Sequence, residues 1–516
     1  MRDVSFRLTN VRFLILLVLF GIAMPGMVWL AADPAYAAGD APADTVYLPY
    51  IAAAPQATPA PTATAVPTPD APVVEVFVDT QWKTSNAAIQ VDNQGALHVA
   101  YYFYEPQYGP DPDGAANPTG AVYLTCPARC DDGANWAGVS MGERVNEVQL
   151  ALTADGGPRL LYRTWESTVL TDGRDYVYAA CDVACTEPAN WTETVVASSY
   201  GTDSFDIQDD NLPQRSFALD PQGRPRFVYL DRNYVTEPDR YGLYYMACDA
   251  VCTDAANWTD TLLTAVTSEP FDWELVKYPT LTFTAAGGPR LVSAEFFPLG
   301  EGEPGLTYFA CDTGCDDAAN WGHVRLADRG QGSEPSVDLA LDDGGRPRLA
   351  FYQESIDDVT GQRLYYLWCD GACLDADNWQ QLELGLGPRN GQEPDIALDG
   401  AGRPRIAYAD YDVGGMGYAW CDGDCTTAAG WQHVNVETSA ALAQVWPVAY
   451  PPHCDAGLWD GMTPSLALDR GGLPWVAYDT VYNARCWYND DSGIWEPDYR
   501  FHLVMRAVRV VEVRLP

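Results

Sequence analysis

Two large apolar residues flank one intervening residue, most often a small one, at seven places along the chain, each just before a polar turn. Phe217 and Leu219, for example, flank Ala218 in the run "SFALDPQGRP". The flanking pairs at the other six places are Ile89 with Val91, Leu150 with Leu152, Leu281 with Phe283, Leu339 with Leu341, Ile396 with Leu398 and Leu466 with Leu468. A period of two predicts a β-strand. The middle residue is Ala in five of the seven copies, which suits a sheet that is packed on both faces.

The turn after each of these strands recurs as well, with the form Asp-x-x-Gly-x-Pro in its strongest copies. Its glycines, spaced 57 to 70 residues apart, are Gly95, Gly156, Gly223, Gly287, Gly345, Gly402 and Gly472. A second strand follows each turn, then an aromatic-rich third strand, and then a fourth. Four-stranded sheets repeated radially bury both faces against their neighbours. The chain is therefore predicted to be all-β, a seven-bladed β-propeller of four-stranded antiparallel blades over residues 73–516.

Closure of the ring can also be predicted. The last unit ends in a run at 501–516 that has the pattern of its third strand, with no turn after it. The segment "PVVEVFVDT" at 72–80 precedes the first strand of unit one and has no other partner. We expect this segment to supply the outer strand of blade seven. The alternative is that the C-terminal run folds back as its own fourth strand.

The N-terminus has the form of an export signal. Arg2, Arg7 and Arg12 precede an apolar run at 13–32, and the run at 35–37 is an A-x-A cleavage site. We expect a signal peptide over residues 1–37, with an uncleaved membrane anchor as the alternative, and no other membrane segment. Residues 38–72, rich in Pro, Ala and Thr, are predicted to be a flexible linker. The protein is expected to be secreted or held at the cell surface.

Twelve cysteines form six pairs with the spacing Cys-x-x-x-Cys, each after the third strand of a unit. They are Cys126 with Cys130, Cys181 with Cys185, Cys248 with Cys252, Cys311 with Cys315, Cys369 with Cys373 and Cys421 with Cys425. Zinc would need two more ligands per pair, and no histidine recurs in the repeat. A thioredoxin-like centre would need Cys-x-x-Cys in another fold. An oxidising compartment favours disulfides, and Cα atoms of residues four apart in a helical turn are about 6 Å apart, within disulfide range. We expect the two remaining cysteines, Cys454 and Cys486, to pair between loops.

Four other recurring residues are interpreted as structural. The turn Asp could bind calcium, but Thr153 and Thr284 replace it in two units, and both residue types accept hydrogen bonds from turn amides. Trp258 and its five equivalents recur at a fixed offset, as packing residues do. The residue before each Trp is Asn or Gly, which predicts a left-handed backbone there. The second-strand arginines, expected to pair with surface acids, are Arg159, Arg226, Arg290, Arg348 and Arg405.

The net charge of the chain limits the kinds of partner that it can bind. The chain has 30 basic and 71 acidic residues, a net charge of −41. Such a protein repels phosphates, so no nucleic-acid partner is expected. No cofactor is expected, but free carboxylates leave calcium open. We expect a monomer whose partner is a glycan or an extracellular protein.

Acids and aromatics gather where the second strands end, near the long loops of one face. Aromatic rings beside carboxylates commonly hold sugars, by stacking and by accepting hydroxyl hydrogens. The other interpretation is a solvated acidic rim with aromatics in the blade packing. The candidate ligand-binding residues are Glu105, Glu166, Asp231, Glu295, Glu354, Asp410, Asp479, Tyr104, Trp165 and Tyr411.

The repeats resemble secreted bacterial β-propellers and, more distantly, sialidase-type propellers with Asp-box repeats. The resemblance implies the fold; the Asp-box itself differs from Asp-x-x-Gly-x-Pro, and no catalytic residue is carried over. We expect a binding module for a glycan or protein that acts through the long-loop face. The alternative is a sialidase-like glycoside hydrolase or lyase with an acid pair in the central funnel. Candidates for that pair are Asp209, Asp272, Glu274, Glu334, Glu393, Asp395 and Asp460.

Overall fold

The computed structural model describes most of the predicted propeller. The described residues are 73–78, 82–106, 119–142, 144–164, 167–168, 173–200, 215–231, 242–265, 277–295, 305–328, 336–353, 363–387, 389–445, 455–489 and 494–515. The predicted signal peptide and linker lie outside them, as do Cys454 and the side chain of Cys486, so the pairing of these two cysteines stays a prediction. In the described part of the chain, none of the helices is both long and apolar enough to span a bilayer.

The strands form seven four-stranded antiparallel sheets, which confirms the predicted seven-bladed propeller. Blade 1 consists of β2 (Trp82–Val91), β3 (Leu97–Pro106), β4 (Gly120–Cys126) and β5 (Ala137–Met141). Blade 2 consists of β6 (Val145–Leu152), β7 (Pro158–Thr164), β8 (Gly173–Ala180) and β9 (Thr192–Tyr200). Blade 3 consists of β10 (Phe217–Leu219), β11 (Pro225–Asp231), β12 (Gly242–Cys248) and β13 (Trp258–Ala265). Blade 4 consists of β14 (Lys277–Phe283), β15 (Pro289–Glu295), β16 (Gly305–Ala310) and β17 (Gly322–Asp328). Blade 5 consists of β18 (Ser336–Leu341), β19 (Pro347–Gln353), β20 (Arg363–Cys369) and β21 (Trp379–Glu383). Blade 6 consists of β22 (Asn390–Leu398), β23 (Pro404–Asp410), β24 (Gly415–Cys421) and β25 (Trp431–Glu437). Blade 7 contains β26 (Asp455–Leu468), β27 (Pro474–Asn489) and β28 (Ile494–Val513).

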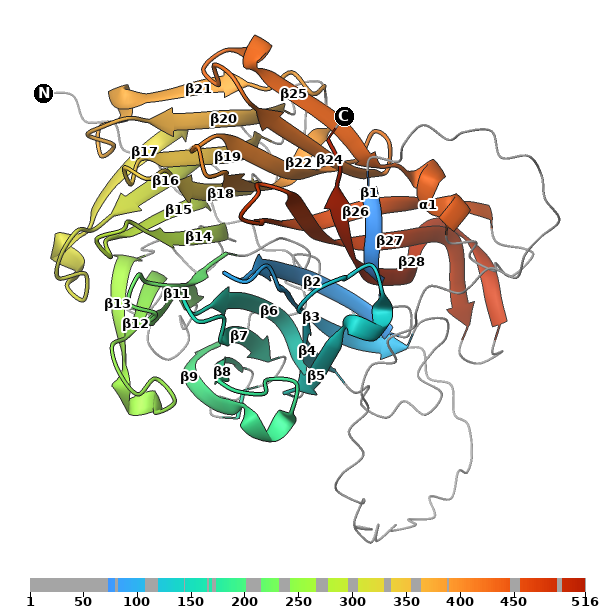
Figure 1. The fold of residues 1–516 in the computed structure, drawn as a ribbon, viewed down its shortest axis with the longest axis horizontal. Coiled ribbons are helices and arrows are strands. Elements are labelled where there is room, and N and C mark those ends of the chain that lie inside the picture. Colours follow the sequence, from blue (N-terminus) through green and yellow to red (C-terminus); the bar gives the residue numbers. More distant parts are fainter. Residues whose placement is uncertain are drawn as a thin grey trace, which may run out of the picture. The chain divides into compact units, whose positions relative to one another are not determined.

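The N-terminal strand closes the ring. β1 (Val73–Val78) pairs antiparallel with β28 and forms the outer edge of blade 7. In Figure 1 this blue strand lies among the red strands of the C-terminal blade. The predicted closure is therefore confirmed, and the alternative of a fold-back by the C-terminal run is wrong.

The hydrophobic core lies between neighbouring blades. One cluster, for example, joins Tyr178 of blade 2 to Phe217, Phe227 and Trp258 of blade 3. Tyr178 and Trp258 meet edge to face with ring centroids 5.4 Å apart. The same pairing of a third-strand Tyr with the Trp of the next blade recurs for Tyr123 with Trp191, Tyr245 with Trp321, Tyr308 with Trp379 and Tyr366 with Trp431. The repeated Trp is a packing residue, as predicted, and it packs across blades.

The Asp-x-x-Gly-x-Pro turn has the predicted chemistry. Oδ1 of Asp220 accepts hydrogen bonds from the backbone N–H of Gln222 and of Arg224, both at 3.0 Å. Gly223 has a φ of +76°, the left-handed conformation that glycine adopts at least cost. In two other blades the hydroxyls of Thr153 and Thr284 accept the equivalent bond. The acid therefore shapes the turn.

All six predicted Cys-x-x-x-Cys pairs are disulfides, with Cα–Cα distances of 5.7–5.8 Å. In chain order, Cys126 is bonded to Cys130, Cys181 to Cys185, Cys248 to Cys252, Cys311 to Cys315, Cys369 to Cys373 and Cys421 to Cys425. No cysteine with a described side chain is free. Each bridge closes the turn between the third and fourth strands of its blade, so the structural interpretation of these pairs is confirmed.

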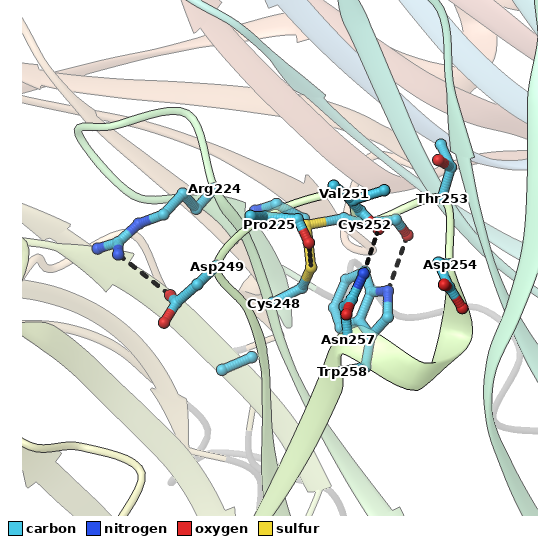
Figure 2. Close-up of a disulfide and its surroundings, with 12 residues drawn as sticks. Arg224, Pro225, Cys248, Asp249, Val251, Cys252, Thr253, Asp254, Asn257 and Trp258 are labelled. Carbon is cyan, nitrogen blue, oxygen red and sulfur yellow. Dashed lines mark hydrogen bonds and ion pairs between the residues drawn. A yellow bond between two sulfur atoms is a disulfide. The ribbon is translucent and has the colours of Figure 1, made fainter.

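The Trp after each bridge packs beneath it. Figure 2 shows the bridge between Cys248 and Cys252 with Trp258 below, whose Nε1–H donates to the carbonyl of Cys252 at 2.9 Å. The predicted left-handed residue before the Trp is wrong. Asn257 ends a 3-10 turn, and its side chain donates to the carbonyl of Val251, which is the left-handed residue (φ +53°). The side-chain amide of Asn257 thus satisfies the carbonyl of this left-handed residue.

The second-strand arginines pair with surface acids, as predicted. Arg405, for example, donates to the carbonyl of Cys421 at 2.8 Å and to the carboxylate of Asp422 at 2.6 Å. The other four arginines bind the equivalent carbonyl and aspartate of their own blades. They tie the second strand to the disulfide turn.

Candidate functional site

Four of the ten predicted ligand-binding residues have described side chains. Asp410 and Asp479 are buried, whereas Tyr104 and Tyr411 are half-buried. The side chains of the other six, Glu105, Glu166, Asp231, Glu295, Glu354 and Trp165, lie outside the described residues. Among the carboxylates considered for an acid pair, only Glu393 and Asp395 are described; Asp209, Asp272, Glu274, Glu334 and Asp460 are not. Ligand binding by the ten residues stays a prediction.

The inner strands of blades 1, 6 and 7 share an irregularity that positions several of these groups. Each contains one extra residue relative to its neighbour, at 85–88, 392–395 and 462–465. At each bulge one residue takes a left-handed backbone: Asn86 (φ +58°), Glu393 (φ +50°) and Thr463 (φ +49°). A bulge redirects side chains, and Pro394 and Pro464, which follow two of these residues, are the sequence signal for it.

Glu393 lies where blades 6 and 7 meet. Its Oε2 accepts the backbone N–H of Thr463 at 2.5 Å, and the hydroxyl of Tyr411 donates to its Oε1 at 3.5 Å. Burial, helped by the negative charge of Asp479, raises the pKa of Glu393 to about 8, although Thr463, Arg506 and Tyr411 favour the ionised form. Glu393 is thus a protonated carboxylic acid at neutral pH.

Asp479 lies where blades 7 and 1 meet. Its Oδ2 forms an ion pair with Arg506 at 2.6 Å. The same oxygen accepts the hydroxyl of Ser85 at 2.9 Å and the backbone N–H of Asn86 at 3.2 Å. Burial alone would lower the pKa of Arg506, but the charge of Asp479, with contributions from Tyr104 and Tyr102, raises this pKa above its ordinary value.

We call Glu393, Tyr411, Thr463, Asp479 and Arg506 the junction cluster. It contains Asp479 and Tyr411 from the predicted set and has Tyr104 beside it. Asp410, by contrast, closes a tight turn: its Oδ1 accepts the N–H groups of Asp412 and Val413 at 3.1 and 3.3 Å, and burial raises its pKa.

A second group of charges lies on the inner strands. Arg215 of blade 3 forms ion pairs with Asp395 of blade 6 and, at 3.3 Å, with Asp338 of blade 5. It also donates to the carbonyl of Leu466 in blade 7. Burial and the nearby Asp338 raise the pKa of Asp395, although Arg215 favours its ionised form. Because Arg215 reaches from blade 3 to blades 5, 6 and 7, it lies across the central channel.

The inner-strand carboxylates also connect blades directly. The backbone N–H of Leu466 donates to Asp395 at 2.9 Å, and that of Ile396 donates to Asp338 at 2.7 Å. Gln149 and Ser465 accept the equivalent bonds from Phe217 and Ile89 at 2.7 and 3.2 Å. Sequence reasoning missed this role. The sequence feature that indicates this role is a polar residue directly before the first large apolar residue of the inner strand.

A cavity of about 280 Å³ lies between the inner strands, and we call it the axial cavity. Arg215, Asn86, Gln149, Thr280 and Ser465 contribute polar groups to its wall. Its volume is just below the range of about 300–1,000 Å³ that is usual for small-molecule sites, which suits a ligand about the size of one sugar ring. Asn86 connects the axial cavity to the junction cluster, because its N–H donates to Asp479. Within the described part of the chain, no three His, Cys, Asp or Glu side chains converge to hold a metal ion.

Comparison with known proteins finds similar solved structures at low sequence identity. No protein-family model and no curated protein matches it. A protein of unknown function from Dyadobacter fermentans matches at 10% identity and a TM-score of 0.42, with 86% of this chain and 98% of that one covered. The β-propeller domain of the trilobed protease from Pyrococcus furiosus matches at 10% identity and 0.41, with 82% and 96% covered. The intramolecular trans-sialidase from Ruminococcus gnavus matches at 10% identity and 0.36, with 86% and 96% covered. The chain is similar, at low identity, to sialidase-type and other propellers.

Proposed function

We propose that this protein is an extracellular binding module that takes a glycan at the junction cluster and the adjoining axial cavity. The observation that carries the proposal is the convergence of half-buried tyrosines with buried carboxylates where blades 6, 7 and 1 meet. Tyrosine rings offer faces on which a sugar can stack, and carboxylates accept its hydroxyl hydrogens. Six disulfides are typical of a protein in an oxidising compartment, where extracellular glycans are found.

Binding is favoured over catalysis because the described inner carboxylates already hold the ring together. Oδ2 of Asp395, Asp338 and Asp479 each accepts a backbone N–H from the next blade. Asp479 is in addition paired with Arg506. A carboxylate fixed in this way orients a ligand well, but it has little freedom to exchange protons with a substrate.

The experiment is a glycan array with the full-length protein, read with and without a calcium chelator. The proposal expects binding to a restricted set of glycans that persists after chelation, because aromatic and carboxylate contacts need no metal. Binding that is lost on chelation would move the site to calcium held by the acidic loop face. The absence of any glycan binding would refute the proposal and favour a protein partner.

A second candidate, glycoside hydrolysis, is favoured by one observation. Glu393 is protonated at neutral pH and lies near the carboxyl group of Asp479, which is the arrangement of a general acid beside a second carboxyl group. Glycans bound on the array should then be cleaved slowly, and Glu393→Gln should abolish cleavage while it preserves binding. Measurement of released reducing ends between about pH 5 and 9 decides between the two functions.

A further inference from the structure

The junction cluster contains buried polar atoms without a partner among the described residues. Oδ1 of Asp479 and the hydroxyl of Thr463 have no hydrogen bond there. The two residues are 0% and 1% exposed. Unpaired buried polar atoms are rare in folded proteins and indicate where a water or a ligand group completes the bonding. Because a carboxylate oxygen only accepts hydrogen bonds, the missing group beside Asp479 must be a donor.

The positive charges near this cluster are already compensated. Arg506 is held by Asp479, with Nη2 2.6 Å from its Oδ2. Arg215 lies between the carboxylates of Asp338 and Asp395, so two acids surround one guanidinium. A ligand carboxylate or sulfate placed here would meet no uncompensated arginine among these groups. It would also be repelled by acids in a site of low dielectric constant.

We propose that the junction cluster selects uncharged glycans, bound through their hydroxyl hydrogens, and rejects glycans that carry a carboxylate or a sulfate. This inference rests on the proposed binding function and names its ligand class. A sugar hydroxyl matches the unpaired atoms because it donates to Asp479 Oδ1 and also accepts from the Thr463 hydroxyl. A carboxylate or sulfate offers acceptors only.

The test compares an uncharged glycan with the same glycan carrying one terminal sialic acid, by titration calorimetry with the full-length protein. The net charge of −41 repels any anion, wherever it binds. Both titrations are therefore made in about 0.5 M NaCl, where charges more than about 5 Å apart are screened. We expect the sialylated form to bind at least about tenfold more weakly. Equal or tighter binding of the sialylated form would overturn the inference and leave the proposed function standing, whereas no binding of either form would overturn both.

Two matched variants locate the effect. Thr463→Val removes the unpaired hydroxyl with little change of shape and should weaken the uncharged glycan about fivefold. Thr480→Val is the control: its hydroxyl is also buried without a described partner, but it follows Asp479 along β27 and so lies on the opposite face of the sheet. Both variants should fold alike, and only Thr463→Val should lose affinity. Equal affinities in the two variants would place the ligand elsewhere.

Discussion

Replacement of Glu393 by Gln should remove a large pH dependence of stability. In the folded protein the pKa of Glu393 is raised from its ordinary 4.5 to about 8, chiefly by burial. Between these two values the folded chain holds a proton that the unfolded chain releases. Stability must therefore fall as pH rises through this range.

The size of the effect follows from the two pKa values. One pH unit corresponds to about 1.36 kcal/mol, so the interval from 4.5 to about 8 corresponds to a loss of about 5 kcal/mol. Glutamine imitates the protonated acid: its oxygen can accept the N–H of Thr463, and its amide can donate to the hydroxyl of Tyr411. Glu393→Gln should thus match the wild type near pH 5 and exceed its stability by about 5 kcal/mol near pH 8.5.

Urea unfolding of both proteins at several pH values measures this difference. Other groups titrate too, including Asp395, but they are common to both proteins and cancel in the comparison. Glu383→Gln is the matched control, because Glu383 is half exposed in its ion pair with Arg363 and should give a profile like that of the wild type. Parallel profiles for the wild type and Glu393→Gln would refute the reasoning.

Three further predictions concern the stability of the ring and are checked by urea or thermal unfolding. Arg215→Met should cost about 3–5 kcal/mol, because it leaves two buried carboxylates without a counter-charge; a loss below about 1 kcal/mol would contradict this. Removal of one disulfide by Cys248→Ala with Cys252→Ala should cost about 2 kcal/mol, as expected for a five-residue loop, and a neutral result would assign the bridge no part in stability. Asp220→Ala should lower the free energy of unfolding by about 2 kcal/mol, because the turn loses two hydrogen bonds. Asp220→Thr should lower it less, since the chain itself uses Thr at two such turns. Equal losses of stability in the two variants would contradict this account of the turn.

Most of the fold could be predicted from the sequence repeat. Period-two alternation and the recurring turn were sufficient to predict seven sheets, because each strand position recurs in every blade with the same packing demand. The disulfides and the structural turn Asp followed from spacing and from the Thr replacements. The backbone before the Trp was predicted wrongly because Asn is both a residue that tolerates a left-handed conformation and a good side-chain donor. Asn257 uses its amide for the left-handed Val251.

The candidate site was harder to predict because its residues come from different blades. Asp479 and Tyr411 could be singled out as recurring polar and aromatic positions, but their partners, Arg506 and Glu393, lie in other strands of the same blades. Thr463, which donates its N–H to Glu393, lies in the next blade. Nothing in the spacing of these residues indicates that they meet. Arg215 was missed altogether, because it precedes only one of the inner strands. Among the described residues, no Arg of another blade takes its place between acids of different blades.

Asp479 shows why a recurring acid need not have one role. Its Oδ2 joins blade 7 to blade 1 through Ser85 and Asn86, which is where the ring closes. Its Oδ1 has no partner within the described residues. If that second oxygen binds the ligand, as proposed, the ligand is held by the same carboxylate that closes the ring. Ligand binding would then stabilise the closed ring, by an amount that grows with the logarithm of the affinity, and closure would in turn position the oxygen for the ligand.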